Sequence, residues 1–120
     1  MSYYYLATPY SKYPGGLEAA FQMACRQAAI LIKAKVPVYC PIAHTHPIAV
    51  QNDMDPFDHG IWLPADTPMM LAASGLIIVK APTWELSYGI AEERKVFAAA
   101  GKPIVWMEVD VLPEEFCLVG

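Results

Sequence analysis

A short apolar run followed by a long proline-free stretch limits how this chain can fold. Gly75-Leu-Ile-Ile-Val79 is rich in β-branched residues, which is typical of a buried parallel strand. Lys80-Ala-Pro82 ends this run, and the chain then continues from Trp84 to Ala100 without proline before reaching Gly101. That pattern predicts a helix with a glycine cap. Open α/β sheets bind ligands at such strand-to-helix junctions, beside the carboxyl ends of the strands.

The predicted helix carries a carboxylate where an apolar residue is expected. At about 100° per residue, six residues fall on one face of the helix, which is expected to face the sheet: Leu86, Gly89, Ile90, Val96, Phe97 and Ala100. Glu93 falls in the middle of this face. A carboxylate directed at apolar packing is costly unless it is paired or hydrogen-bonded, and such groups are often functional. Glu93 is therefore either a site residue or a group that reaches solvent or an arginine at a thin edge of the sheet.

The other apolar patterns complete an α/β domain. Alternating and continuous apolar runs indicate strands, whereas apolar residues three and four apart indicate helices. Strands are expected at 3–8, 36–40, 75–79 and 102–107, and helices at 17–35, 62–74 and 84–100. A right-handed crossover would join the first two strands, giving a parallel sheet of four or five strands. The tail, 108–120, would form a last strand or dock on a neighbour through its apolar part, 116–119.

Length and composition exclude several kinds of protein. The 120 residues suffice for one domain, residues 1–120, but not for two. The net charge is −4 and no cluster of Lys or Arg exists, which argues against a nucleic-acid partner. The chain is 56% hydrophobic and 17% charged, so we expect some apolar surface to be covered in a homo-oligomer.

Targeting and cysteine patterns suggest a cytoplasmic protein. No apolar run reaches the ~18 residues needed to cross a bilayer, and no basic region opens the chain. We therefore expect no membrane partner. The three cysteines are odd in number and lack a C-x-x-C pair, which suits a reducing compartment.

Polar side chains follow the first predicted strand directly. Thr8, Pro9, Tyr10 and Ser11 stand where a strand-to-helix loop should lie, and such loops often bind ligands. The alternative is a turn set by Pro14-Gly15-Gly16, and the two interpretations are compatible.

The segment 41–64 looks irregular and holds all three histidines. His44-Thr45-His46 has the alternation of a strand or extended loop, not the i, i+4 spacing of a zinc-binding helix. Asp53-Met-Asp55 begins like a calcium loop, but Phe57 and Asp58 stand where an oxygen ligand and a glycine belong. We therefore predict no metal and no cofactor, and expect a loop lid over a polar pocket, with His44 and His46 as candidate binding residues.

A second carboxylate points inward from the helix expected at 62–74. Asp66 shares a face with Trp62, Met69, Met70 and Ala73. Asp66 is either a site residue or an acid in the first helical turn, where the helix dipole and a following Pro68 would favour it.

Taken in order, these segments resemble a known superfamily. The resemblance rests on Tyr5-Leu-Ala-Thr-Pro-Tyr-Ser11, on Asp66, on Trp84-Glu-x-Ser87-x-Gly89 with Glu93, and on Gly101-Lys-Pro103. Together they resemble the nucleoside 2-deoxyribosyltransferase-like superfamily and, more closely, a small bacterial branch of undefined function. The match covers nearly the whole chain. It implies a three-layer flavodoxin-like fold, oligomers whose subunits complete one another's sites, and cleavage or exchange of an N-glycosidic bond.

The chemistry implied by the resemblance needs two carboxyl groups in different environments. In the superfamily a glutamate attacks the anomeric carbon of a deoxyribosyl group, and an acid helps the nucleobase leave. The transferase motif places this glutamate two residues before the Gly of Glu-x-Gly-x-Ala, where this chain has Ser87 in Ser87-Tyr-Gly89-Ile-Ala91. Related branches pair a serine at the helix start with an acid six residues later, which here is Glu93. The acid often found before the central strand is replaced by Ser74 and Gly75.

Two functions remain compatible with these residues. In the first, Glu93 or Glu85 is a nucleophile or base, Asp66 assists the leaving nucleobase, and Tyr5 or Tyr10 orients the sugar. In the second there is no catalysis: Ser87 and the N–H groups of the helix start bind a phosphate or ribose, beside Trp84 and Gly89 as further binding candidates. The structural alternatives are that Glu85 is a first-turn acid and Ser87 an N-cap.

Overall fold

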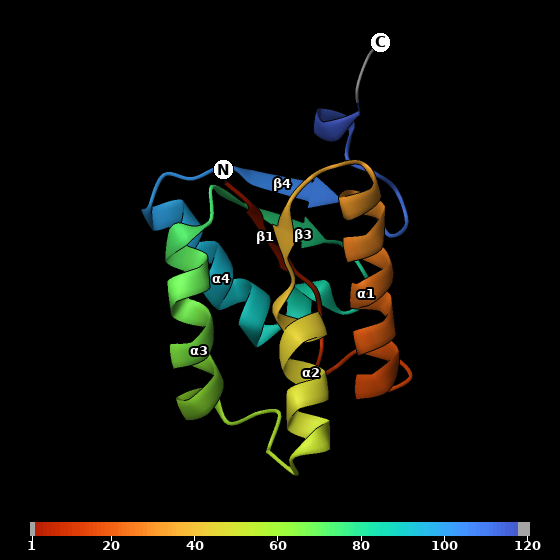
Figure 1. The fold of residues 1–120 in the computed structure, drawn as a ribbon, viewed down its shortest axis with the longest axis vertical. Helices are drawn as coiled ribbons and strands as arrows, with labels where there is room; N and C mark the ends of the chain where they lie inside the picture. The colour runs from red at the N-terminus through yellow and green to blue at the C-terminus, as the bar shows by residue number, and fades with distance from the viewer. Residues whose placement is uncertain (1, 118–120) are drawn as a thin grey trace.

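Four parallel strands form the central sheet of the computed structural model, which describes residues 2–117 (Figure 1). The strands are β1 (Tyr4–Ala7), β2 (Val38–Tyr39), β3 (Gly75–Val79) and β4 (Ile104–Met107). Their order in the sheet is β2-β1-β3-β4, with Tyr5 opposite Leu76 in the register of the two central strands. The α/β fold class predicted from the sequence is confirmed, because this parallel order is the flavodoxin-like one.

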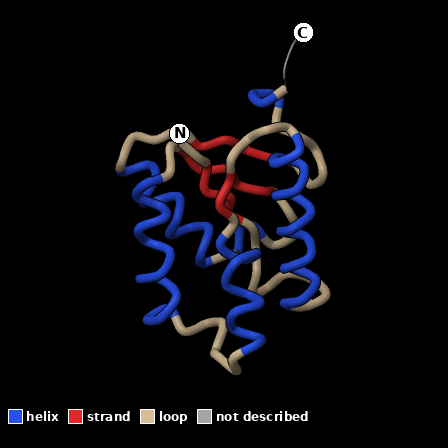
Figure 2. The backbone as a smooth tube through the Cα atoms, viewed as in Figure 1, coloured by secondary structure: helices blue, strands red, loops and turns tan. Residues whose placement is uncertain are grey.

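Helices cover both faces of the sheet and give the fold three layers (Figure 2). They are α1 (Leu17–Lys33), α2 (Pro41–Gln51), α3 (His59–Ala72) and α4 (Tyr88–Ala99), with short 3₁₀ turns η1 (Trp84–Leu86) and η2 (Glu114–Phe116). Successive strand residues alternate between two cores, as the pleat requires. Leu6 and Ile77 pack with α1, whereas Tyr5 and Leu76 pack with α3 and α4.

The prediction that segment 41–64 is irregular is wrong, because helix α2 occupies its first half. Pro41 stands at the start of α2, where proline lacks only a hydrogen bond that the helix does not need. Thr45 Oγ1 donates to the Pro41 carbonyl at 2.9 Å, and His46 and Ala49 are buried. The expected loop is therefore shorter, 52–58, and its Pro56 and Phe57 line a cavity described below. Helix α2 contacts α1 and β1 and lies below the strands, between α3 and α1, in the view of Figure 1.

Helix α3 begins earlier than predicted, which changes the interpretation of Asp66. Asp58 caps the helix by accepting a hydrogen bond from the Gly60 N–H at 3.1 Å. Because α3 starts at His59, Asp66 lies in the middle of the helix. The alternative that Asp66 is a helix-start acid is therefore wrong, and its inward position needs another explanation.

The helix predicted after β3 is divided into η1 and α4. Ser87 Oγ accepts a hydrogen bond from the Ile90 N–H at 3.2 Å, which confirms the N-cap interpretation of this serine. Ile90 and Phe97 are buried against the sheet as expected, and Gly101 follows α4 with a left-handed φ of 68°. The predicted inward face is wrong at three positions that are exposed: Leu86, Gly89 and Ala100. Leu86 lies in the 3₁₀ turn, before the α-helical repeat begins, so its side chain does not share the inward face of α4.

The tail contributes no strand within its described part, 108–117. It packs instead through η2, where the Phe116 ring lies edge-on to Tyr4 with 5.1 Å between ring centroids. The predicted apolar docking segment, 116–119, extends to Leu118 and Val119, which lie outside the described residues. Across residues 2–117, no helix is both long and apolar enough to span a bilayer.

Candidate functional site

Two adjoining cavities open beside the carboxyl ends of the strands. The first, here the polar cavity, has a volume of about 170 Å³ and is lined by residues that include Thr8, Tyr10, Thr45, His46 and Ser87. These come from the segments that follow β1, β2 and β3. The chain crosses from one side of β1 to the other between β2 and β3, so this edge is the topological switch point where α/β sheets bind ligands.

The second cavity lies between α3, α4 and the sheet. This apolar cavity has a volume of about 420 Å³, and its walls include Tyr5, Trp62, Leu63, Met70 and Val96. Six residues line both cavities and so mark their junction: His59, Trp62, Asp66, Tyr88, Gly89 and Glu93. The two carboxylates that looked misplaced in the sequence therefore meet at one place.

Glu93 extends from the middle of α4 into this junction. Burial raises the pKa of its carboxyl to about 8, the Tyr5 hydroxyl opposes this shift, and the nearby Asp66 adds to it. Among residues 2–117, no Lys or Arg forms an ion pair with Glu93. The alternative that Glu93 reaches an arginine is therefore wrong, and at neutral pH its carboxyl is mainly protonated.

Asp66 is the less enclosed carboxyl of the pair. The Tyr39 hydroxyl donates a hydrogen bond to Asp66 Oδ1 at 3.3 Å. Burial raises the pKa of Asp66, while the Tyr39 hydrogen bond and the charge of His44 lower it. Burial likewise raises the pKa values of Tyr5 and Tyr39, with the carboxylates adding to both shifts, so both phenols remain hydrogen-bond donors.

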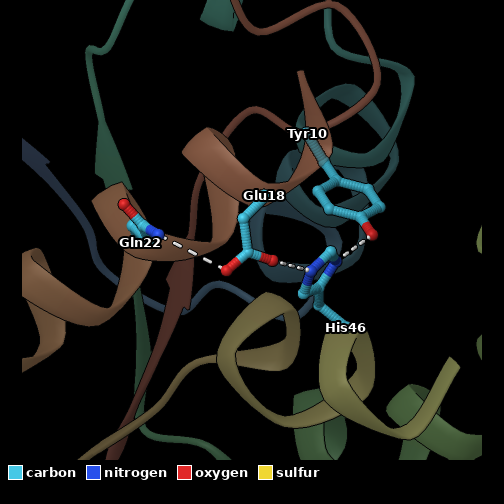
Figure 3. Close-up of polar contacts among 4 residues, drawn as sticks. All are labelled: Tyr10, Glu18, Gln22 and His46. Carbon is cyan, nitrogen blue, oxygen red and sulfur yellow. Dashed lines mark hydrogen bonds and ion pairs between the residues drawn. The ribbon is translucent and has the colours of Figure 1, made fainter. Parts of the chain in front are cut away.

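Three polar side chains, Glu18, His46 and Tyr10, are linked in a row (Figure 3), and two of them, His46 and Tyr10, line the polar cavity. Glu18 Oε2 lies 2.9 Å from His46 Nε2, and His46 Nδ1 lies 2.6 Å from the Tyr10 hydroxyl oxygen. The His46 ring also stacks on Phe21, with 4.7 Å between centroids. Sequence reasoning missed Glu18, because its position at the start of a helix fits an ordinary solvent-exposed acid.

One hydroxyl in the lining of the polar cavity is buried without a partner. Thr8 is 5% exposed and its Oγ1 is buried without a hydrogen bond. A buried hydroxyl left unpaired costs free energy, so this atom is suited to pair with a ligand.

The structure brings most of the predicted site residues together. The two cavities are lined by Tyr5, Thr8, Tyr10, Ser11, His46, Asp66, Ser87, Gly89 and Glu93. Site residues that the sequence did not indicate are Glu18, Tyr39, His59, Trp62 and Tyr88. Trp62 could have been found from its position on the same face of α3 as Asp66. Tyr39 and Tyr88 gave no such signal, because they looked like ordinary strand and helix residues.

Four predicted residues lie elsewhere. Glu85 and Trp84 line a separate small hollow with Arg94. His44 is exposed on α2, with its ring 5.8 Å from that of Tyr39. Pro9 is buried and lines neither cavity. In the described part of the chain, no three His, Cys, Asp or Glu side chains are grouped as a metal site requires.

Comparison with known families places the chain in one of them. A family model described as "Domain of unknown function (DUF1937)" matches residues 2–109. The match covers most of the sequence, so the chain belongs to this family. A search of curated proteins finds no significant match.

Proposed function

We propose that this protein cleaves the N-glycosidic bond of a nucleoside or nucleotide, as a hydrolase or as a 2-deoxyribosyltransferase. The observation that carries this proposal is the position of Asp66 and Glu93, which line both the polar and the apolar cavity. A nucleoside has a hydroxyl-rich half and a flat aromatic half. With the sugar in the polar cavity and the nucleobase in the apolar one, the bond between them lies at the two carboxyls.

The different environments of the two carboxyls support different roles for them. Glu93, with a pKa of about 8, is mainly protonated at pH 7 and donates a proton to the leaving base. Burial raises the pKa of Asp66, but the hydrogen bond from Tyr39 opposes this shift, and Asp66 is less enclosed than Glu93, so Asp66 is the better candidate for the nucleophile. These roles are the reverse of those expected from the sequence, where Glu93 was the nucleophile or base.

The reaction then takes two steps. An Asp66 carboxylate oxygen forms a bond to the anomeric carbon, the C–N electron pair passes to the base, and the base takes the Glu93 proton. In the second step the Glu93 carboxylate removes a proton from water, which attacks the anomeric carbon and releases Asp66. A second nucleobase in place of water gives transfer. Tyr39, which donates a hydrogen bond to Asp66, acts as a positioning residue, and the Tyr5 hydroxyl beside Glu93 is the second candidate for this role.

The direct test is base release from purine and pyrimidine 2′-deoxynucleosides and their 5′-monophosphates, followed by chromatography. Wild type should release base, and Glu93→Gln should be slower on the order of a hundredfold or more, as for loss of a general acid. Glu85→Gln is the matched control, since Glu85 lies outside both cavities, and should retain wild-type activity. No release from any substrate by a folded wild type would overturn the proposal.

A second candidate is a nucleotide-binding module without catalysis. It is favoured by Ser87 and Gly89, which line the polar cavity at the start of α4, where backbone N–H groups attract phosphate. This function predicts a rise in melting temperature with nucleotides, no base release, and loss of that rise in Ser87→Ala.

We also propose a homo-oligomer. Three apolar side chains of α3 are about half or more exposed: Ile61, Leu63 and Leu71. Sedimentation velocity should show a dimer or larger species that Leu71→Glu dissociates. A monomer at every concentration would contradict it.

A further inference from the structure

The hydroxyl-bearing residues of the polar cavity divide into those that already have partners and those that do not. Thr45 Oγ1 donates to the Pro41 carbonyl, and Ser87 Oγ accepts from the Ile90 N–H. Thr8 Oγ1 has no partner although it is buried. The Tyr10 hydroxyl forms one hydrogen bond, with His46 Nδ1. Ser11 and Tyr88 also line the cavity, but both are exposed to solvent. The enclosed hydrogen-bonding capacity of this wall therefore lies at Thr8 and Tyr10.

The direction of the hydrogen bonds along Glu18, His46 and Tyr10 follows from their chemistry. A carboxylate only accepts hydrogen bonds, so His46 Nε2 carries the proton that is donated to Glu18. In the neutral ring the other nitrogen then accepts. The Tyr10 O–H therefore donates to His46 Nδ1, across 2.6 Å, and its remaining capacity is a lone pair.

Several contacts hold this direction fixed (Figure 3). Gln22 Nε2 donates to the second Glu18 oxygen at 3.4 Å. Phe21 covers one face of the His46 ring, which is 5% exposed. Both ring nitrogens are occupied, so the ring does not rotate without losing both hydrogen bonds. Glu18 and His46 thus act as positioning residues for the Tyr10 hydroxyl.

We propose that Thr8 and Tyr10 form a subsite for a single ligand hydroxyl, with Tyr10 as the acceptor for its proton and Thr8 as the donor to its oxygen. This inference takes its ligand class from the proposed function, so the hydroxyl is one borne by the sugar of a nucleoside. A phosphate oxygen is a poor occupant, because the acceptor lone pair of Tyr10 would face it. No Lys or Arg from the described chain lines the polar cavity to offset such a charge.

The subsite is tested by removing one hydroxyl from the protein and one from the ligand. The probes are 2′-deoxyadenosine and its analogues lacking either the 3′- or the 5′-hydroxyl, titrated calorimetrically against Glu93→Gln protein so that the probes are not consumed. Glu93→Gln protein with Thr8 and Tyr10 unchanged should bind one of the two analogues about fivefold to tenfold more weakly than 2′-deoxyadenosine, as for one lost hydrogen bond.

The variants then locate that hydroxyl. Tyr10→Phe and Thr8→Val should each weaken 2′-deoxyadenosine, and in Tyr10→Phe the sensitive analogue should bind nearly as well as 2′-deoxyadenosine. Glu18→Gln should reduce the same difference without abolishing it. Tyr13→Phe is the matched control, because it removes a phenol from the same loop but lines neither cavity, and it should retain the full difference.

The outcomes separate this inference from the proposed function. Equal loss of affinity for both analogues in Tyr10→Phe, or no binding of any probe by folded protein, would overturn the subsite. Tighter binding of 2′-deoxyadenosine 5′-monophosphate that depends on the Tyr10 hydroxyl would also overturn it. Base release by wild type with no effect of Thr8→Val or Tyr10→Phe leaves the function standing alone. Hydroxyl-specific binding without base release leaves the subsite standing alone.

Discussion

Glu18 and Glu93 are the same residue type in two surroundings that move their pKa values in opposite directions. Glu93 lines both cavities, whereas Glu18 lines neither and contacts the polar cavity's wall through His46. The Glu18 side chain is 65% exposed and has polar neighbours at both oxygens. Its hydrogen bond with His46 is the main cause of a lowered pKa. Glu93 is partly buried, forms no ion pair among residues 2–117, and has its pKa raised by burial to about 8.

Under the proposed function, this difference separates a positioning carboxylate from a proton donor. Glu18 is charged and holds another side chain in place, so its removal should disturb orientation more than stability. Burial of Glu93 favours its protonated form, and carboxyls perturbed in this way inside a cavity are often functional. The predictions below test this contrast, beginning with the largest effect.

The pH dependence of catalysis should show the Glu93 proton directly. Because Glu93 must be protonated to assist the leaving base, kcat/KM should fall about tenfold per pH unit above a pKa of about 8. A pH series of base release on one 2′-deoxynucleoside measures this. An activity that instead rises through pH 8 would assign the nucleophile to Glu93 and reverse the two roles.

Stability should depend on pH through the same group. The pKa of Glu93 is raised from 4.5 to about 8 on folding, so the folded state binds a proton more tightly than the unfolded chain. Stability is therefore full below about pH 4.5 and is lost as pH rises through 8. Relative to wild type, Glu93→Gln should gain stability across this range, reaching on the order of a few kcal/mol. Denaturant unfolding at pH 5, 7 and 9 gives the difference, and a constant difference would contradict the assignment.

The acid side of the activity profile should respond to Tyr39. Tyr39→Phe removes the donor to Asp66, so the pKa of Asp66 rises and activity at acid pH is lost at a higher pH than in wild type. The half-maximal point on the acid side is the measurement. Tyr3→Phe serves as control, because the Tyr3 hydroxyl donates to the Met69 carbonyl. An equal shift of the half-maximal pH in both variants would mean that Tyr39 does not act through Asp66.

The smallest expected effect belongs to Glu18. Its pKa is lowered on folding by His46, so its contribution to stability is present at neutral pH and is lost as pH falls through the lowered pKa. Glu18→Gln should therefore reduce the melting temperature slightly at pH 7 and not at pH 3. A large loss at both pH values would mean that Glu18 has a packing role.

The sequence predicted much of the fold because its strands and longest helices have strong patterns. The continuous run at β3 and the apolar repeat of α1 gave the parallel sheet and its first crossover. Helix α2 was missed because Pro41, Pro47 and the alternating His44-Thr45-His46 all suggested an extended segment. Its packing against α1 and β1 overrides that local preference.

The sequence indicated those cavity-lining residues whose own position in a local pattern was unusual. Glu93 and Asp66 stood out because each broke an apolar helix face. The role of Glu18 depends on His46, which lies 28 positions away, and no local pattern records such a contact. The 3₁₀ turn before α4 likewise turned Trp84 and Glu85 out of the site.

The protonation state of Glu93 is the central claim, and carbon NMR measures it most directly. Protein labelled with ¹³C at the glutamate side-chain carboxyl, with the Glu93 signal assigned from its absence in Glu93→Gln, is titrated from pH 3 to pH 10. We predict that this signal titrates near pH 8, while that of Glu18 titrates below the ordinary range of a glutamate. A Glu93 signal that titrates near 4.5, the ordinary value for a glutamate, would contradict the assignment of Glu93 as the proton donor.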